Sequence, residues 1–205
     1  MYQPEVSLLP WPTEESRIVE IARVSSSRQD KREDGAKLLR YLIKNSHWSP
    51  FEHAHATFSI RTSRAIGAQL LRHRSFTFQE LSQRYTETPT ATIPQMRMAA
   101  DTNRQSSSEV ANTDLQAKAI MAITAARDAY SELVAAGVAT ECARMVLPMA
   151  TETHIYMTGN VRSWIHFLAI RDDPHAQLEI QWVAQKIRAL FNAAYPETAR
   201  ALSEL

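Results

Sequence analysis

Residues 53–61 have the sequence HAHATFSIR, in which polar and apolar side chains alternate without interruption. Because side chains point alternately to the two faces of a strand, the alanines, Phe58 and Ile60 would line one face. The pattern therefore predicts a β-strand with one apolar face. His53 and His55 share the other face, but no third ligand follows at a recognisable spacing, so we predict no metal site.

The segments on either side of this strand carry signals for a turn and a helix. Residues 47–53, HWSPFEH, predict a turn whose proline favours an extended backbone at Ser49. A loop position suits His47 for ligand binding, and capping of the preceding helix is the alternative role. After the strand, Ser63 is a suitable N-cap for a helix over residues 65–72.

Apolar residues at helical spacing, together with start and stop signals, predict the remaining elements. Helices are expected over residues 13–24, 35–45, 114–136, 140–147, 161–171 and 174–195. Gly137 would end the helix over residues 114–136. A second, less regular strand is expected over residues 151–158, where Gly159 would end it. Residues 86–112 are polar and marked by prolines, which predicts a long loop, either a substrate lid or a disordered segment.

The composition argues against several classes of protein. With 205 residues, 44% of them hydrophobic, we expect a single domain over residues 1–205. Lys+Arg 23 and Asp+Glu 22 give a net charge of +1, which argues against binding to nucleic acid or to an anionic membrane. The lack of a long apolar run and of a charged leader favours a cytoplasmic protein. The lone cysteine, Cys142, is expected to be a small buried residue and not a nucleophile.

Residues 71–86, LRHRSFTFQELSQRYT, concentrate hydrogen-bonding side chains without glycine or proline. In a helix, consecutive residues point about 100° apart, so Arg72, His73 and Arg74 would serve different partners or different parts of one extended anion. If residues 80–84 are extended, a carboxylate, a hydroxyl and a guanidinium share one face, which suits a phosphate beside a sugar hydroxyl. The alternative is a pair of surface arginines next to a salt-bridged turn.

The pattern Arg72-His73-Arg74, seven further residues and then Ser82-Gln-Arg-Tyr resembles the signature of the flavin-dependent thymidylate synthases. These enzymes methylate dUMP without a catalytic cysteine. Further segments resemble the family in the same order along the chain. They are residues 47–53 (HWSPFEH), residues 143–148 (ARMVLP) and the block over residues 160–180.

The resemblance implies a cofactor site and a substrate site. FAD would be bound by His47, Ser49, Arg72, His73, Arg74, Glu80, Asn160, Arg162 and His166. The nucleotide dUMP would be bound by Gln69, Arg72, Glu80, Ser82, Gln83, Arg84, Arg144 and Arg171. Arg171 would be the catalytic residue, which meets the uracil ring. NADPH and methylenetetrahydrofolate would be co-substrates.

Some residues depart from the family's usual pattern. Gln79 and His166 stand where asparagines are common, and both retain hydrogen-bonding capacity. Gln83 stands where a small residue is common and adds bulk beside the phosphate region.

The resemblance also implies the fold and the assembly. The expected fold is α+β, with a small, mostly antiparallel sheet packed with helices. Binding residues spread over separate segments, with adjacent arginines facing different ways, fit a site built between subunits. The implied assembly is a homotetramer with inter-subunit sites.

The residues suit this chemistry. Methylation at C5 of uracil needs electron density at that carbon, which a cysteine thiolate provides in conventional thymidylate synthases and reduced FAD provides in this family. Arginine is not a base at neutral pH because its pKa exceeds about 12. Arg171 would therefore stabilise negative charge on the O2/N3 edge of uracil, by about 3 kcal/mol.

Two other functions remain open at this point. One is the transfer of a different one-carbon group, such as hydroxymethyl, to a pyrimidine nucleotide, with Gln83 and His166 as the distinguishing residues. The other is a non-catalytic nucleotide or RNA binder, although near-neutral charge and the absence of aromatic stacking motifs argue against RNA.

Overall fold

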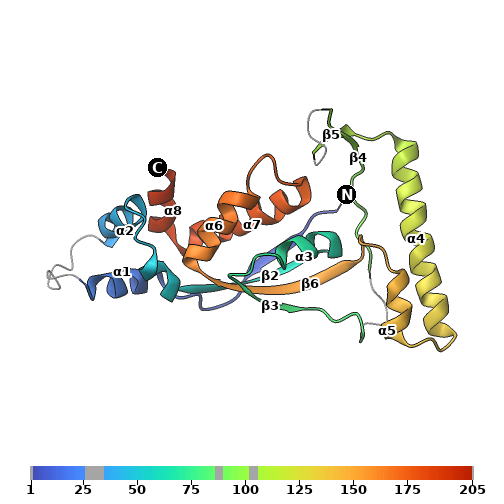
Figure 1. Ribbon diagram of the computed structural model, residues 1–205, viewed down its shortest axis with the longest axis horizontal. Helices are drawn as coiled ribbons and strands as arrows, with labels where there is room; N and C mark the ends of the chain where they lie inside the picture. The colour runs from blue at the N-terminus through green and yellow to red at the C-terminus, as the bar shows by residue number, and fades with distance from the viewer. Residues whose placement is uncertain (1, 26–34, 86–89, 102–105, 205) are drawn as a thin grey trace.

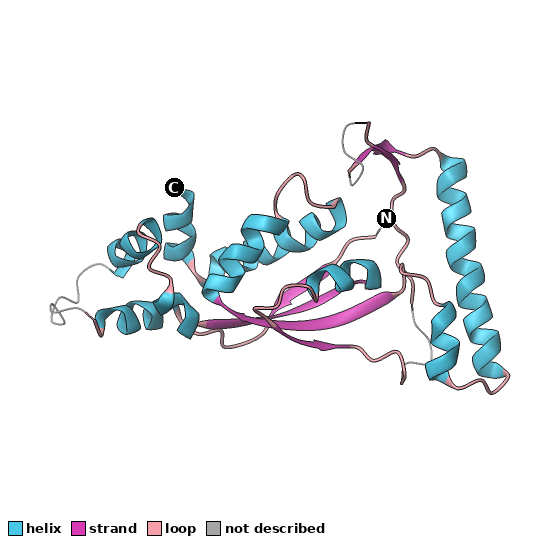
Figure 2. Cartoon of the chain, viewed as in Figure 1, coloured by secondary structure: helices cyan, strands magenta, loops and turns pink. Residues whose placement is uncertain are grey.

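A computed structural model describes residues 2–25, 35–85, 90–101 and 106–204 of the protein. The architecture is α+β, as expected: a small antiparallel sheet carries helices on one face, and a long helix stands apart at one end of the molecule (Figures 1 and 2). Within the described parts of the chain, none of the helices has the length and apolar character that a membrane crossing requires.

The sheet has the strand order β1-β2-β6-β3, and every neighbouring pair is antiparallel. Its strands are β1 (Glu5–Leu8), β2 (His55–Ser63), β6 (Glu152–Asn160) and β3 (Thr77–Glu80). The strand predicted over residues 53–61 is confirmed in type and phase, because Phe58 and Ile60 are fully buried. It begins at His55, since His53 still belongs to a 3-10 turn. The strand β1, which the sequence pattern does not indicate, pairs antiparallel with the edge of β2.

The apolar face of the sheet forms the core together with several helices. The sheet is covered by α3 (Arg64–Leu70), α6 (Val161–Arg171) and α7 (Leu178–Ala194). At one end of the sheet, α1 (Glu15–Arg23), α2 (Gly35–Lys44) and α8 (Pro196–Ser203) extend this core (Figure 1). Trp164 of α6 is fully buried, and its ring packs edge-on against Phe58 with 4.6 Å between centroids. Its indole nitrogen donates to the Ala56 carbonyl at 3.1 Å, so α6 is tied to β2 by both packing and a hydrogen bond.

The C-terminal helical region differs from the prediction. One helix was expected from residue 174 to its closure at Pro196, but α7 begins only at Leu178. The preceding turn is held by the Asp173 carboxylate, which accepts from the backbone of His175 at 2.8 Å. Pro196 opens α8, consistent with the preference of proline for the first turn of a helix.

Gly159 does not end β6, which continues to Asn160. A Cβ atom at this position would lie 2.4 Å from the Phe76 ring, so the glycine allows an aromatic side chain to rest directly on the strand. The prediction that Gly159 breaks the strand was wrong because the residue is required for close approach and not for a turn.

The segment over residues 86–112, expected to be a loop, contains a β-hairpin. Its strands are β4 (Arg97–Ala99) and β5 (Ser107–Val110), paired antiparallel. Residues 86–89 and 102–105 lie outside the described chain. The hairpin is joined to α7 by a nearly buried ion pair in which Arg97 donates two hydrogen bonds, of 2.7 and 2.9 Å, to Glu179.

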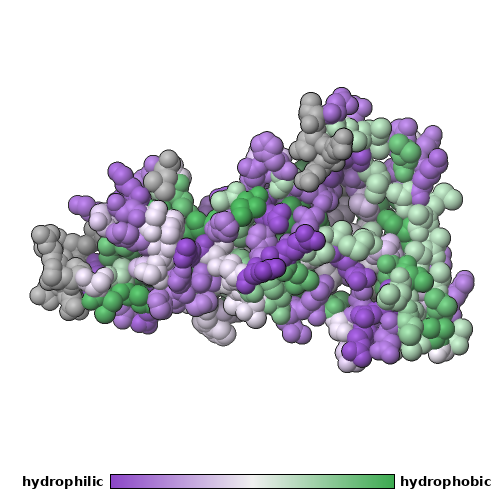
Figure 3. All heavy atoms as spheres, viewed as in Figure 1, coloured by the Kyte–Doolittle hydropathy of each residue, from purple (hydrophilic) through white to green (hydrophobic). Residues whose placement is uncertain are grey.

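The long helix that stands apart is α4 (Thr113–Ala135), followed by α5 (Thr140–Ala143) and the 3-10 turn η2 (Arg144–Val146). The Asn112 side chain caps α4 by accepting from the Leu115 amide at 3.0 Å, and Gly137, with φ of 87°, follows its end as predicted. Cys142 was expected to be buried, but it is exposed. Figure 3 shows apolar residues (green) on the open surface of this end of the molecule.

Candidate functional site

Two clefts in the protein are lined by several of the residues that the sequence predicts to be functional. The first, of about 760 Å³, is lined by Trp48, Glu52, Ser75, Asn160, Arg162, Ser163, Ile165, His166 and Ala169. The second, of about 400 Å³, is lined by Arg64, Ala68, Leu71, Glu80, Leu81, Ser82, Gln83, Arg144 and Met149. The first therefore holds part of the expected FAD set, and the second holds part of the expected nucleotide set.

The first cleft is built where β6 passes into α6. Asn160 ends the strand, and its side-chain oxygen caps the helix by accepting from the Ser163 amide at 2.8 Å. Its amide NH₂ group is left as a donor. One turn of helix then places Arg162 and His166 on the exposed side of α6, as expected from their spacing. Arg162 forms an ion pair with Glu52.

The second cleft joins the end of β3 to the turn η2, which is far away in sequence. Glu80 is the last residue of β3, and its carboxylate accepts from the Thr153 hydroxyl at 2.7 Å. Arg144 lines the opposite part of the cleft, and its Nε–H donates to the Glu141 carbonyl at 3.3 Å. The Glu80 carboxylate, the Ser82 hydroxyl and a guanidinium thus come together, but the guanidinium is that of Arg144 and not, as expected, that of Arg84.

The extended conformation considered for residues 80–84 is not observed. The strand β3 ends at Glu80, and the chain turns so that the Tyr85 amide donates to the Ser82 carbonyl at 3.2 Å. This turn buries the Gln83 side chain and directs Arg84 toward solvent, where it pairs with Glu141 at 3.2 Å. The alternative of a surface arginine beside a salt-bridged turn therefore describes Arg84.

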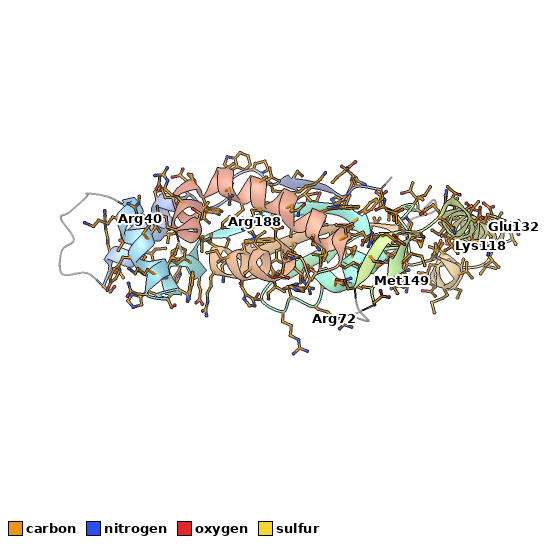
Figure 4. All side chains as sticks on the ribbon, turned by 90° about the horizontal axis from the view of Figure 1, so that it is seen from above. Arg40, Arg72, Lys118, Glu132, Met149 and Arg188 are labelled. Carbon is orange, nitrogen blue, oxygen red and sulfur yellow. The ribbon has the colours of Figure 1, made fainter. Side chains whose placement is uncertain are left out.

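The helix α3 ends at Leu70 and does not include Arg72, His73 and Arg74, so the helical spacing expected of them is not observed. Arg72 and Arg74 are exposed, and Figure 4 shows the Arg72 side chain extending away from the body. His73 is half-buried, and its ring lies edge-on to Phe76 and Phe167, with centroids 6.2 and 5.0 Å away.

Arg171, at the end of α6, donates from Nε to Nε2 of His73 over 2.9 Å. Burial, together with the charges of Arg171 and His166, lowers the pKa of His73 to about 4. Burial also lowers the pKa of Arg171. The imidazole is therefore neutral at pH 7 and acts as the acceptor, while Arg171 keeps its charge.

Several expected site residues line neither cleft. They are His47, Ser49, Gln69, Arg72, His73, Arg74, Arg84 and Arg171. His47 closes α2 through its backbone, because its amide donates to the Leu42 carbonyl at 2.8 Å after Ser46 adopts φ of 57°. Its side chain stays exposed, so the capping role and a ligand-binding role do not conflict. Gln69 donates to the Gln177 side chain at 2.6 Å.

The structure adds residues that the sequence alone did not assign. Trp48 and Glu52 line the first cleft, and Arg64 and Met149 line the second. Both Trp48 and Glu52 lie inside the segment HWSPFEH, which is the sequence signal that could have indicated them. Among the described residues, no group of three or more histidine, cysteine, aspartate or glutamate side chains is arranged to hold a metal ion.

Comparisons with known proteins identify the family to which the chain is similar. The family described as "Thymidylate synthase complementing protein" matches residues 8–197. The chain is 38% identical over 205 residues to a flavin-dependent thymidylate synthase of Synechocystis sp., covering 98% of this chain and 95% of that protein. It is also 38% identical over 196 residues to a probable flavin-dependent thymidylate synthase of Paramecium bursaria Chlorella virus 1, covering 93% and 91%.

Solved structures give the same result. The UMP/dUMP methylase PolB from Streptomyces cacaoi, bound with 5-Br UMP, superposes with a TM-score of 0.84 at 30% identity and covers 100% of this chain and 96% of that chain. The same enzyme bound with 5-Br dUMP gives a TM-score of 0.83, with 99% and 96% covered. With likeness over almost its whole length in sequence and in structure, this chain belongs to the flavin-dependent thymidylate synthase family.

Proposed function

We propose that this protein converts dUMP to dTMP by reductive methylation, with FAD as cofactor, methylenetetrahydrofolate as carbon donor and NADPH as reductant. The observation that carries the proposal is the convergence of Glu80, Ser82, Gln83 and Arg144 on one cleft. These residues come from segments far apart in the chain, and each was expected to bind the nucleotide. Family membership supports the same reaction.

The second cleft supports binding of a nucleoside monophosphate. The Arg144 guanidinium and the Ser82 hydroxyl are donors suited to phosphate oxygens, and the Glu80 carboxylate is an acceptor suited to a sugar hydroxyl. With a formal net charge of only +1 for the chain, attraction of the phosphate depends on these local groups.

The first cleft fits a flavin nucleotide in size and in the chemistry of its lining. Its volume of about 760 Å³ lies within the range of sites for large organic ligands. Arg162 provides a positive charge for a pyrophosphate, Trp48 an aromatic surface, and Asn160 and His166 hydrogen-bonding groups. When bound there, FAD supplies the electrons that the methylation consumes.

The chain's own residues bind the substrates and stabilise charge. We assign no catalytic role to the lone cysteine, Cys142, which is exposed. Arg171 remains charged at neutral pH and, beside the base, would stabilise negative charge on the O2/N3 edge of uracil by about 3 kcal/mol.

We extend the proposal to a homotetramer whose neighbouring copies complete the two clefts. Exposed Arg72 and Arg74, expected to bind FAD, line neither cleft of one copy. The helix α4 has a single buried residue, Tyr130, and exposes apolar side chains such as Met121. A second copy packed nearby would account for both features.

The visible absorption spectrum of the purified protein, recorded before and after anaerobic addition of NADPH, tests the cofactor. We expect a flavin spectrum that NADPH bleaches, and a change in the bleaching rate when dUMP is present, because the nucleotide and the flavin would be adjacent. A colourless protein that takes up no added FAD would contradict the proposal.

Mass spectrometry of the nucleotide formed from dUMP and methylenetetrahydrofolate tests the product. We expect dTMP, and a hydroxymethylated nucleotide would instead support the related C5-transfer enzyme. The variant Arg171→Ala is expected to lose turnover while it keeps its flavin. Unchanged turnover in this variant would contradict the role given to Arg171.

A further inference from the structure

The contact between His73 and Arg171 joins two distant parts of the chain. His73 lies in the turn after α3, and Arg171 lies at the end of α6, 98 residues later. Their hydrogen bond, Nε to Nε2 over 2.9 Å, has the length of a good N–H donor bond. It brings the motif Arg72-His73-Arg74 to the residue expected to meet the uracil ring.

The direction of this hydrogen bond follows from the chemistry of the two groups. A guanidinium has only donors, so Nε2 of His73 must offer a lone pair and the ring proton must lie on Nδ1. Burial and the neighbouring charges of Arg171 and His166 lower the pKa of His73, which keeps the ring in this neutral form at pH 7.

The ring of His73 is held in place by its surroundings. Phe167 meets it at an interplanar angle of 66°, and Phe76 meets it at 88°. Phe76 is in turn seated on Gly159 and packs against Trp164, with 4.6 Å between centroids. A ring packed on rigid elements is a fixed acceptor and not a mobile surface group.

The backbone of His73 is also engaged. Its amide donates to the Leu70 carbonyl at 3.0 Å, and its carbonyl accepts from the Phe76 amide at 3.2 Å. The turn is thereby fixed on both sides of the ring, so the acceptor nitrogen has a defined position relative to α6.

This contact leaves the rest of the guanidinium available. With Nε engaged, rotation of the planar group about its last bond is restricted, and the terminal nitrogens keep one orientation. Among the described residues, no carboxylate forms an ion pair with Arg171, in contrast to Arg162 and Arg188. An oriented cation without a protein counter-ion is suited to an anionic or polarised ligand.

We propose that His73 is a positioning residue for the methylation: it accepts the Nε–H of Arg171 and turns the terminal nitrogens of that guanidinium toward the uracil. The inference rests on the proposed function, because it takes dUMP as the ligand that Arg171 meets. It assigns the imidazole of His73 to Arg171, whereas the family resemblance by itself assigns His73 to FAD.

A matched pair of variants separates the two roles. His73→Phe keeps an aromatic ring against Phe76 and Phe167 but removes the acceptor, while His73→Gln offers an amide oxygen as a replacement acceptor. We expect His73→Phe to lower kcat about 100-fold while the KM for dUMP and the bound flavin change less than about threefold. His73→Gln should recover about tenfold of the lost kcat.

The Arg171→Ala background provides the control. If His73 acts through Arg171, adding His73→Phe to Arg171→Ala should lower kcat less than about twofold, because the interaction is already absent. Independent, multiplying losses in the double variant would overturn the proposal. So would equal losses of kcat in His73→Phe and His73→Gln, or a loss of flavin from His73→Phe with kcat per bound flavin unchanged.

A readout that needs no turnover tests the contact itself. Long-range ¹⁵N–¹H NMR spectra of the wild-type protein at pH 7 should show His73 as the Nδ1–H tautomer, and Arg171→Ala should change its ¹⁵N shifts. An Nε2–H tautomer or an imidazolium would overturn the inference. If the wild-type protein made no dTMP while the tautomer was as expected, the proposed function would fail and the contact would stand.

Discussion

Two helices of this protein reach their stability in different ways. The helix α6 (Val161–Arg171) buries five of its eleven residues, including Trp164 and Phe167. The helix α4 (Thr113–Ala135) has 23 residues, and only Tyr130 is buried. Both begin with an asparagine whose side chain caps the first turn, so the start signal is the same and the packing differs.

The two helices therefore depend on different interactions: α6 on tertiary packing and α4 on local interactions within its own segment. Tertiary packing fixes the rotation of α6, and that rotation decides which side chains reach the first cleft. Alanine content, an N-cap and Gly137 support α4 locally, while its apolar residues Leu115 and Met121 remain exposed.

The largest expected effect comes from Trp164→Ala in α6. Removal of a fully buried indole should lower the free energy of unfolding by about 4 kcal/mol, through lost burial and the cavity left behind. Met121→Ala in α4, where the side chain is 71% exposed, should change it by less than about 0.5 kcal/mol in a dilute sample. Urea unfolding followed by circular dichroism measures both. An effect of Met121→Ala that grows with protein concentration would show that α4 packs against another copy.

Arg97→Met removes one partner of the ion pair that links the hairpin to α7. Because Glu179 would remain buried without its cation, we expect a loss of about 3 kcal/mol, and the double variant Arg97→Met/Glu179→Met should recover most of it. Urea unfolding at pH 7 measures the loss. A small loss in the single variant would show that water reaches Glu179.

The same ion pair predicts a pH dependence. Burial by itself raises the pKa of Glu179, but hydrogen bonds from Arg97 and Gln177 outweigh it, so the pKa lies below its ordinary value. The stabilisation is therefore present above the ordinary pKa of glutamate and is lost as pH falls through the lowered value. The stability difference between the wild type and Arg97→Met should narrow as pH falls, and a constant difference would contradict this account.

Substitutions of Gly159 and Gly137 by alanine should destabilise the protein by different mechanisms. Gly159→Ala should cost about 2 kcal/mol because the new Cβ meets the Phe76 ring, and Phe76→Leu should relieve much of this cost. Gly137→Ala meets no neighbour, so only its φ of 87° opposes the side chain, at a cost of about 1 kcal/mol. Thermal unfolding ranks the variants. Relief of Gly137→Ala by Phe76→Leu is not expected.

The capping asparagines give the smallest effects. Asn112→Ala and Asn160→Ala should each cost about 1 kcal/mol, since each leaves a first-turn amide without its acceptor. Only Asn160→Ala should weaken FAD uptake, measured by fluorescence titration. Asn160→Asp keeps the cap and removes the NH₂ donor, so it should retain stability and still bind FAD less tightly. Equal FAD affinity in all three variants would remove Asn160 from the cofactor site.

Local patterns predicted the elements that local chemistry controls. The alternation in HAHATFSIR, the cap at Ser63 and the stop at Gly137 each depend on neighbouring residues, and each is observed. The errors occurred where distant residues decide the outcome. Gly159 stays within β6 because Phe76 rests on it, and β1 exists because it adds to the edge of β2.

The candidate site was predictable to a similar extent. Residue types and motif spacing indicated which side chains were involved, but not that Glu80 and Arg144 share a cleft apart from Arg162 and His166. The extended backbone predicted for residues 80–84 was also wrong. The chain turns at residues 82–85, and this turn buries Gln83.

By itself, then, the sequence determined the α+β class, most helix boundaries, the flavin-dependent thymidylate synthase family and the set of residues expected at its sites. Only the tertiary structure decided the grouping of those residues into two clefts and the pairing of His73 with Arg171. The physical reason is range: capping, periodicity and turn preferences act over a few residues, whereas a cleft or a buried contact joins residues that the packing of the sheet and its helices brings together.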